Sequence, residues 1–189
     1  MKILYIHGYN GHEDGMTAQM IRNARPNDTV CAPAIDYTHP LDACRQIVDA
    51  VNIYRPDAIV ASSLGAFCVL HEDFGVCSVL INTALPKDMM KIVSDKSMLA
   101  ELDEMLYDIL SNYDRPRNEF VYFVFGDNDV VANNREYLKS LFSSDGYDHT
   151  YVKEMGHALS KECVTHELNH ILNEIAFSAH VFGNERDFL

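Results

Sequence analysis

Positive charge is scarce in this chain. Only 15 Lys and Arg residues stand against 28 Asp and Glu residues, so the formal net charge is −13, and no local cluster of basic residues offsets this average. Because affinity for nucleic acid comes mainly from Lys and Arg contacts to phosphate, we expect no nucleic-acid partner. Long apolar runs are also lacking, since none approaches the ~20 residues that cross a bilayer. We therefore expect no membrane partner either.

Cysteine occurs in no paired pattern. The five cysteines are odd in number and widely spaced, and none forms a C-x-x-C pair. Most lie in apolar segments, so buried free thiols in a reducing cytosol are the simplest interpretation. The first residues, Met1–His7, form a short apolar run without a small-residue cleavage site, which predicts a first strand and not a secretory signal. Both observations predict a cytoplasmic protein.

The length and composition predict a single α/β domain over residues 1–189. The chain has 48% hydrophobic and 23% charged residues, as an ordinary globular domain does. Short apolar, β-rich runs alternate with helical patterns, which predicts a mostly parallel sheet of about six strands with helices on both faces. The expected strands are Lys2–His7, Thr29–Pro33, Ala58–Ala61, Cys77–Asn82, Glu119–Phe125 and Tyr147–Val152. The expected helices are Thr17–Arg25, Leu41–Tyr54, Leu64–Phe74, Asn133–Leu141 and Glu162–Phe177.

The stretch Pro86–Asn118 interrupts this alternation. It is longer than a usual crossover, contains four methionines and has an amphipathic helical pattern near Leu99–Leu110. Because Met-rich helices make adaptable apolar surfaces, we expect a small helical cap at the carboxyl edge of the sheet, inserted at about 86–118. The alternative is a longer crossover helix that packs on the sheet.

The most informative motif is Ala61-Ser62-Ser63-Leu64-Gly65, directly after the apolar run Ala58–Val60. A strand that breaks into small-x-Ser-x-Gly and continues as a helix is typical of a nucleophile elbow. Its strained backbone lifts the serine oxygen above the N-terminus of the next helix, whose positive end favours negative charge by roughly 0.5–1 kcal/mol. The motif predicts Ser63 as a nucleophile. The alternative is a strand that ends in a polar turn.

A serine nucleophile of this kind needs a base and an orienting acid, in the chain order Ser, Asp, His and after later strands. Two aspartates, Asp127 and Asp129, follow the expected strand Glu119–Phe125, and His157 follows the last expected strand. We assign Asp129 as the acid and His157 as the base, with Asp127 fixing the turn through a side-chain hydrogen bond to backbone. Taken separately, a solvated turn carboxylate and a surface loop histidine are the ordinary alternatives.

The third part of the predicted site is the loop His7-Gly8-Tyr9-Asn10-Gly11 after the first strand. Small residues let the backbone curl so that an N–H points at a developing oxyanion. We assign the backbone N–H groups of Tyr9 and Leu64 to this oxyanion hole, where one donor is typically worth about 2.7–4 kcal/mol of transition-state stabilisation. His7 either braces the loop or is a buried histidine bonded to backbone.

Together these pieces resemble the α/β-hydrolases and, within them, the YqiA/YcfP-like small bacterial esterases. The matching pieces span roughly residues 2–160 and are Leu4–Asn10, Ala61–Gly65, Asn82–Ala84, Gly126–Asp129 and Gly156–Ala158. The resemblance implies an α/β-hydrolase-type three-layer sandwich and a triad of Ser63, Asp129 and His157. It also implies esterase or thioesterase activity on small acyl substrates through an acyl-enzyme, with no cofactor and no metal.

The chain departs from the pattern of that family at three places. Ala61 replaces the usual first glycine of the elbow, and Ala66 stands where a second glycine often follows. The stretch Asn82–Leu85 replaces an Asn-Pro-Ala-like sequence. Alanine is small enough for the elbow, so these departures bear on substrate preference.

Two other functions compete with this prediction. The stretch His166-Glu167-Leu168-Asn169-His170 matches H-E-x-x-H, which would make a zinc metallohydrolase with His166 and His170 as ligands. A third ligand is missing, because Asn173 and Ala176 hold the positions of the metzincin Gly and His. The apolar face of this helix also directs both histidines toward solvent. The second rival is a non-catalytic binding protein with the hydrolase fold, against which the intact Ser, Asp and His candidates argue.

Overall fold

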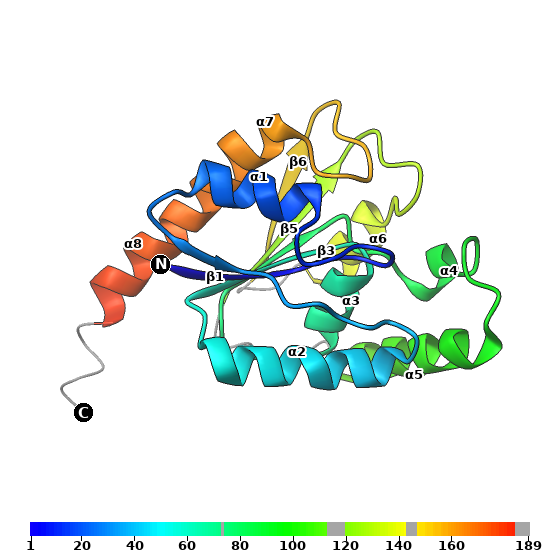
Figure 1. Cartoon of the computed structure of the whole chain (residues 1–189). Coiled ribbons are helices and arrows are strands. Elements are labelled where there is room, and N and C mark those ends of the chain that lie inside the picture. The colour runs from blue at the N-terminus through cyan, green and yellow to red at the C-terminus, as the bar shows by residue number, and fades with distance from the viewer. Residues whose placement is uncertain (73, 113–119, 143–146, 184–189) are drawn as a thin grey trace.

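Six parallel strands form the centre of the molecule (Figure 1). The computed structural model describes residues 1–72, 74–112, 120–142 and 147–183. Neighbouring strands pair in the order β2-β1-β3-β4-β5-β6, and each of these pairs is parallel, as predicted. The strands are β1 Lys2–Ile6, β2 Thr29–Cys31, β3 Ala58–Ser62, β4 Ser78–Ile81, β5 Val121–Gly126 and β6 Tyr147–Val152.

Helices cover both faces of the sheet and complete three layers (Figure 1). They are α1 Met16–Ala24, α2 Pro40–Tyr54, α3 Leu64–His71, α4 Pro86–Met89, α5 Lys96–Asn112, α6 Arg135–Leu141, α7 Lys161–Cys163, the π-helix η1 Val164–Leu168 and α8 Asn169–Gly183. Strand residues alternate between the two faces. Ile3 and Tyr5 belong to the core under α1 and α8, whereas Leu4 and Ile6 belong to the core under α2, α3 and α5. Burial on both faces explains why the central strands are almost continuously apolar.

The strand order reverses direction at β1, and this reversal fixes where a site can form. The chain runs from β1 through α1 to the edge strand β2, and then returns through α2 to β3 on the other side of β1. Right-handed crossovers therefore put α1 on one face and both α2 and α3 on the other. The loops after β1 and β3, which lead to α1 and α3, consequently diverge. The resulting crevice lies at the carboxyl ends of these strands, where the loop 7–11 and Ser63 begin.

The segment after β4 has two structurally different parts. The short helix α4 lies on the side of the carboxyl edge (Figure 1), where Asp88 accepts a hydrogen bond from Asn134 in the loop after β5 (2.6 Å). The long helix α5 packs instead against α2 and α3, with Met98, Leu102 and Met105 buried in the core. Thus α4 lies on the side where the cap is expected, whereas α5 is a crossover helix that packs on α2 and α3. Residues 113–118 of this segment lie outside the described residues.

The observed element ends agree with the predicted ones to within three residues, except at the closing helix. Residue 119, the first of the strand expected at Glu119–Phe125, lies outside the described residues. The closing helix runs from Lys161 to Gly183 through α7, η1 and α8, and is therefore longer than predicted. Its π-helical part was not predicted, because a pattern with 3.6 residues per turn cannot indicate a wider turn.

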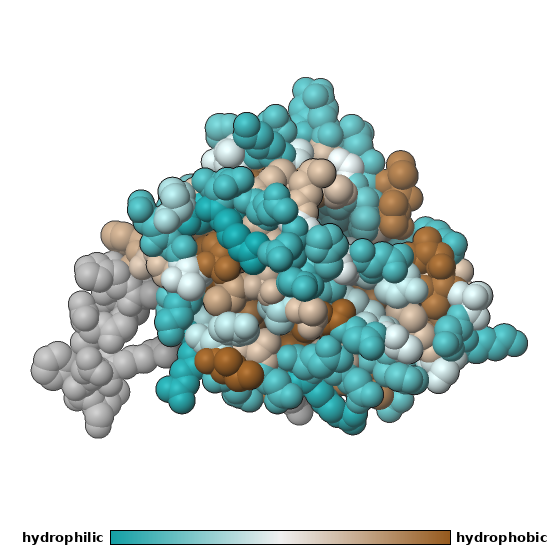
Figure 2. All heavy atoms as spheres, in the orientation of Figure 1, coloured by the Kyte–Doolittle hydropathy of each residue, from teal (hydrophilic) through white to brown (hydrophobic). Residues whose placement is uncertain are grey.

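The face of the molecule in Figure 2 is mostly hydrophilic, and its apolar residues form small, separate patches. Among the described residues, the strongly exposed large apolar side chains include Val130 at 89% and Met16 at 78%. Within the described residues, no helix has both the length and the apolar character needed to cross a membrane.

Candidate active site

Ser63 occupies a strained turn between β3 and α3. Its φ is 52° and its ψ is −123°, a backbone conformation that residues other than glycine rarely adopt. Neighbouring backbone holds this turn on both sides. The Ser63 N–H donates to the Ile81 carbonyl (2.9 Å), and the Ser63 carbonyl accepts from the N–H groups of Phe67 and Ala84 (both 3.2 Å). The elbow motif is therefore present as a fixed turn.

Two glycines let the loop after β1 approach this turn. A Cβ added to Gly8 would lie 2.8 Å from Ser63 Cβ, and one added to Gly65 would lie 2.4 Å from the His7 carbonyl oxygen. Atoms do not pack so closely, so both positions require glycine. Ala61 differs, because its methyl group is fully buried within the core cluster on one face of the sheet. The alanine at this position in the elbow is therefore accommodated.

Ser63, His157 and Asp129 form one hydrogen-bonded chain. His157 Nε2 lies 2.9 Å from Ser63 Oγ, and His157 Nδ1 lies 2.9 Å from Asp129 Oδ2. Because a carboxylate only accepts, Nδ1 carries the proton, and Nε2 is left to accept from the serine hydroxyl. The three residues follow β3, β5 and β6 at the carboxyl edge, so the parallel sheet itself brings them together.

Asp129 is a buried carboxylate with both oxygens bonded. It is 3% exposed, and its Oδ1 accepts from the backbone N–H groups of Val131 (2.8 Å) and Ala132 (3.0 Å). Burial alone would raise the pKa of Asp129. The hydrogen bonds from His157 and the two backbone groups outweigh this effect and hold the pKa below its ordinary value of 3.8. Asp129 is therefore charged at neutral pH and can stabilise a protonated His157.

Asp127, the competing aspartate, makes a different contact. Its Oδ1 accepts from the Glu154 N–H (2.6 Å) in the turn after β6, and its side chain is exposed. The predicted bond to backbone is present, but it joins two loops instead of closing the aspartate's own turn. Asp127 therefore supports the segment that leads to His157.

Asn82 is a positioning residue that the sequence pattern did not reveal. It follows β4 with a φ of 47° and is 1% exposed. Its Nδ2 donates to the carbonyl oxygens of Gly156 and His157 (both 2.9 Å), and its Oδ1 accepts from the Gly126 N–H (2.8 Å). One amide thus joins the loop of His157 to the end of β5. In the sequence, Asn82 is only the end of an expected strand and part of a piece that matches the family pattern. The physical signal for its role is that asparagine tolerates left-handed backbone.

His7 braces the loop after β1 through backbone contacts. It is 3% exposed, and its Nε2 accepts from the Ile35 N–H (3.1 Å). Its Nδ1 therefore carries the proton and donates to the Gly8 carbonyl (2.9 Å). The Tyr37 hydroxyl donates to the His7 carbonyl. Both predicted descriptions of His7 thus apply, because it is buried, bonded to backbone and part of the loop's support.

Tyr9 and Leu64 lie on the two segments that meet at Ser63. Tyr9 directly follows Gly8, whose backbone packs against the Ser63 side chain. Leu64 is the first residue of α3, so its N–H has no hydrogen-bond partner within the helix. Both backbone groups therefore come from the segments that an oxyanion hole beside Ser63 would use.

A cavity of about 360 Å³ opens beside Ser63 and His157. Its walls come from the loop after β1, the start of α1 and the loop after β6. Ser62 also lines it, and the Ser62 hydroxyl bonds to the buried Tyr5 hydroxyl (3.0 Å). This volume is near the lower end of the range for small-molecule sites. The cavity therefore suits a small ligand.

The H-E-x-x-H motif lies on the closing helix, split between two helix types. His166 falls in η1 and His170 falls in α8, and both side chains are exposed, as expected. A π turn is wider than an α turn, so residues four apart no longer stack as a zinc site needs. His170 Nε2 pairs with Glu174 at 3.4 Å. Among the described residues, the one group of three metal-ligating side chains lies elsewhere, on α2 and α3.

No family model matches the chain, and no curated protein sequence matches it. Solved structures match its fold. Est1E from Butyrivibrio proteoclasticus is similar with a TM-score of 0.74 at 12% identity, over 93% of this chain and 88% of that one. The mouse alpha/beta hydrolase domain-containing protein 10 is similar with a TM-score of 0.72 at 14% identity, over 93% and 89%. The chain has the α/β-hydrolase fold.

A third similar structure is that of an esterase domain. The esterase domain of a Rhodothermus marinus protein has a TM-score of 0.64 at 17% identity, over 94% of this chain and 85% of that one. Similarity at such identities extends to the fold, whereas the reaction has to be argued from the side chains at the carboxyl edge.

Proposed function

We propose that this chain is a serine hydrolase, an esterase or thioesterase that cleaves small acyl esters through an acyl-enzyme. The observation that carries the proposal is the hydrogen-bonded chain from Ser63 through His157 to Asp129, with 2.9 Å at each step. The strained Ser63 backbone and the adjoining cavity support it. The α/β-hydrolase fold supports it as well, because that fold carries triads in this chain order.

The reaction runs in two half-reactions. His157 Nε2 accepts the Ser63 proton while Oγ attacks the acyl carbonyl carbon, and then donates that proton to the departing alcohol or thiol. Water then attacks the acyl-enzyme, with His157 again acting as base, and releases the carboxylic acid and free Ser63. Asp129 remains charged throughout and stabilises the protonated imidazole, which its lowered pKa favours.

The charge of the tetrahedral intermediate needs its own donors. We assign the Tyr9 and Leu64 backbone N–H groups to this role, and each is worth about 2.7–4 kcal/mol of transition-state stabilisation by analogy with other oxyanion holes. Support comes from the contact between Gly8 and Ser63 and from the position of Leu64 at the start of α3. Because backbone groups act, substitutions of the Tyr9 side chain should matter less than changes in the loop's path.

A small acyl group fits the proposed reaction best, since the cavity of about 360 Å³ is modest. We also propose that residues 1–189 form a single domain, that the small cap in 86–118 is limited to the part around α4, and that the chain is related to the YqiA/YcfP-like esterases. A cytoplasmic location belongs to the same proposal and is supported by the thiols of Cys31, Cys44, Cys68 and Cys163, none of which forms a disulfide. A panel of p-nitrophenyl esters and acyl-CoA thioesters should show faster turnover for short acyl groups than for long ones.

A fluorophosphonate probe, which labels activated serines, tests the proposal. We expect labelling of the native chain and loss of labelling in Ser63→Ala. Ser62→Ala is the matched control, because Ser62 is the adjacent hydroxyl and bonds to Tyr5 instead of to His157. Its labelling should persist. Failure of the native chain to react would instead favour a binding protein that keeps the hydrolase fold.

A further inference from the structure

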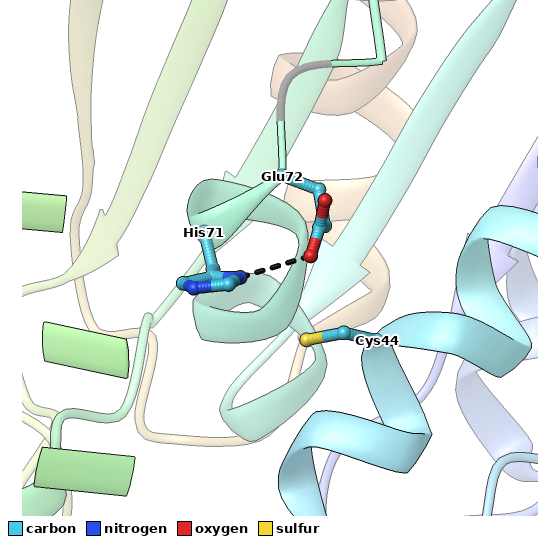
Figure 3. Close-up of side chains that lie close together, drawn as sticks. All are labelled: Cys44, His71 and Glu72. Atoms are coloured by element: carbon cyan, nitrogen blue, oxygen red, sulfur yellow. Dashed lines mark hydrogen bonds and ion pairs between the residues drawn. The ribbon is translucent and has the colours of Figure 1, made fainter. Parts of the chain in front are cut away.

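A second cluster of reactive side chains lies at the other end of α3 (Figure 3). Ser63 precedes the first residue of this eight-residue helix, whereas His71 is its last residue and Glu72 follows it. Cys44 points toward both from α2 (Figure 3). Eight helical residues span about 12 Å, so this cluster is separate from the proposed active site. One ligand atom from each of the three side chains lies within 4.8 Å of the other two.

Side chains that can ligate a metal ion come together here from α2, from the end of α3 and from α5. His71 Nδ1 lies 2.9 Å from Glu72 Oε1, and His71 Nε2 lies 3.8 Å from Asp108 Oδ2 on α5. Cys44 is only 2% exposed. Side-chain exposure then rises to 16% at His71, 32% at Glu72 and 54% at Asp108. The cluster therefore has a buried sulfur at its base and progressively more exposed carboxylates toward solvent.

We propose that Cys44, His71 and Glu72 bind a divalent transition-metal ion, zinc above all, with Asp108 as the neighbouring carboxylate. Thiolate, imidazole and carboxylate are the three ligand types that zinc uses, whereas a thiolate disfavours magnesium and calcium. Zinc bonds of 2.0–2.3 Å place tetrahedral ligand atoms about 3.3–3.8 Å apart. In the structure these atoms lie within 4.8 Å of one another, so small side-chain rotations would bring them to those distances. The ion would join α2 to the end of α3.

The competing occupant of the cluster is a proton on His71, which would pair with both carboxylates. Charge favours the metal, because the four side chains include three acidic groups and a single base. A proton neutralises one negative charge, whereas a divalent ion neutralises two.

Cobalt(II) titration of the full chain, with its thiols kept reduced, tests this proposal by absorption spectroscopy. Cobalt replaces zinc in tetrahedral sites, and a cobalt–thiolate bond gives a charge-transfer band in the near ultraviolet. We expect a band that saturates at one cobalt per chain and disappears when zinc is added. Cys44→Ala should abolish the band. His71→Asn and Glu72→Gln should each weaken cobalt binding about 10- to 100-fold.

Cys31→Ala and His39→Gln are the matched controls. Cys31 is another free thiol, and His39 forms a histidine–carboxylate pair with Glu101 at 3.1 Å. Both variants should keep the band and the affinity. If Cys44→Ala fails to fold, the cobalt affinity of Glu72→Gln tests the proposal instead, because Glu72 is more exposed and its substitution disturbs the core less. A native chain without the band, a band that persists in folded Cys44→Ala, or unchanged affinity in Glu72→Gln would overturn the proposal.

Discussion

Two sets of nucleophile, histidine and carboxylate lie at opposite ends of α3, and they are built in opposite ways. In the set of Ser63, His157 and Asp129, the acid is 3% exposed and the nucleophile lines a cavity. In the set of Cys44, His71 and Glu72, the nucleophile is 2% exposed and the acid side chain is 32% exposed. The first set therefore has a buried acid and an accessible nucleophile, whereas the second has a buried nucleophile and a partly exposed acid.

This reversal decides what each set can do. A buried acid keeps a fixed charge that orients the imidazole, while an open nucleophile can reach a bound carbonyl group. A buried thiol cannot reach a substrate in this way, but with more open partners it can hold an ion that enters from solvent. The backbone agrees with this division, because Ser63 has a φ of 52° whereas Cys44 lies within the regular helix α2. Backbone strain accompanies the set proposed for catalysis.

Replacing each nucleophile by alanine tests the division with the largest expected effect. Ser63→Ala should lower kcat for a short p-nitrophenyl ester on the order of 10⁴–10⁶-fold, because no other group forms the acyl-enzyme. Folded Cys44→Ala should keep its kcat, because Cys44 lies on α2 beside the end of α3 that is far from Ser63. Steady-state hydrolysis rates measure both. Full activity in Ser63→Ala, or equal losses in the two variants, would contradict the assignment.

Replacing each acid by its amide comes next in size. Asp129→Asn should lower kcat by about 10⁴-fold, because an amide can donate to Nδ1 and so select the wrong imidazole tautomer. Glu72→Gln makes the same chemical change beside His71 and should leave hydrolysis intact. Steady-state rates of both variants test this difference between the two acids, and circular dichroism verifies that both variants fold. If Asp129→Asn keeps its rate, another group orients His157.

The set of Ser63, His157 and Asp129 could be predicted from the sequence to lie together, whereas the set of Cys44, His71 and Glu72 could not. Ser63, Asp129 and His157 each follow a strand, and parallel pairing brings the carboxyl ends of strands to one edge. The order of strands and loops therefore suggests their meeting. Cys44 and His71 lie on helices, and the periodicity of each helix gives its buried face but not the residue opposite it.

The same limit applies to the fold. Strand and helix alternation is enough to predict the six-stranded parallel sheet. The amphipathic pattern near Leu99–Leu110 indicates an apolar face without saying which surface it covers, and α5 packs on α2 and α3. Asn82 shows a further limit, because its three hydrogen bonds join segments that only the folded chain brings together.

A smaller effect is expected where the loop after β1 meets the elbow. A Cβ on Gly8 would lie 2.8 Å from Ser63 Cβ, so Gly8→Ala must push the Tyr9 backbone away from the reacting carbonyl. We expect kcat to fall about 10- to 100-fold with KM less affected, as for a weakened oxyanion donor. Gly156→Ala is the control, because a Cβ there meets nothing within 4 Å. Equal effects in the two variants would mean that the loop's path does not govern the rate.

The smallest expected effect concerns stability in acid. The pKa of Asp129 is lower in the folded chain than its ordinary value of 3.8. At pH above that value Asp129 is charged in both states, and its contribution to the unfolding free energy is fully present. As the pH falls below it, the unfolded chain binds the proton first. This contribution to stability therefore decreases, and it is gone once the pH is below the folded pKa of Asp129.

Asp28, another carboxyl group with a lowered pKa, is common to native and variant chains. Urea unfolding of the native chain and Asp129→Asn between about pH 6 and pH 3 should therefore show a steeper loss of stability in the native chain. Parallel pH dependences would mean that the His157 and backbone contacts do not stabilise the Asp129 charge.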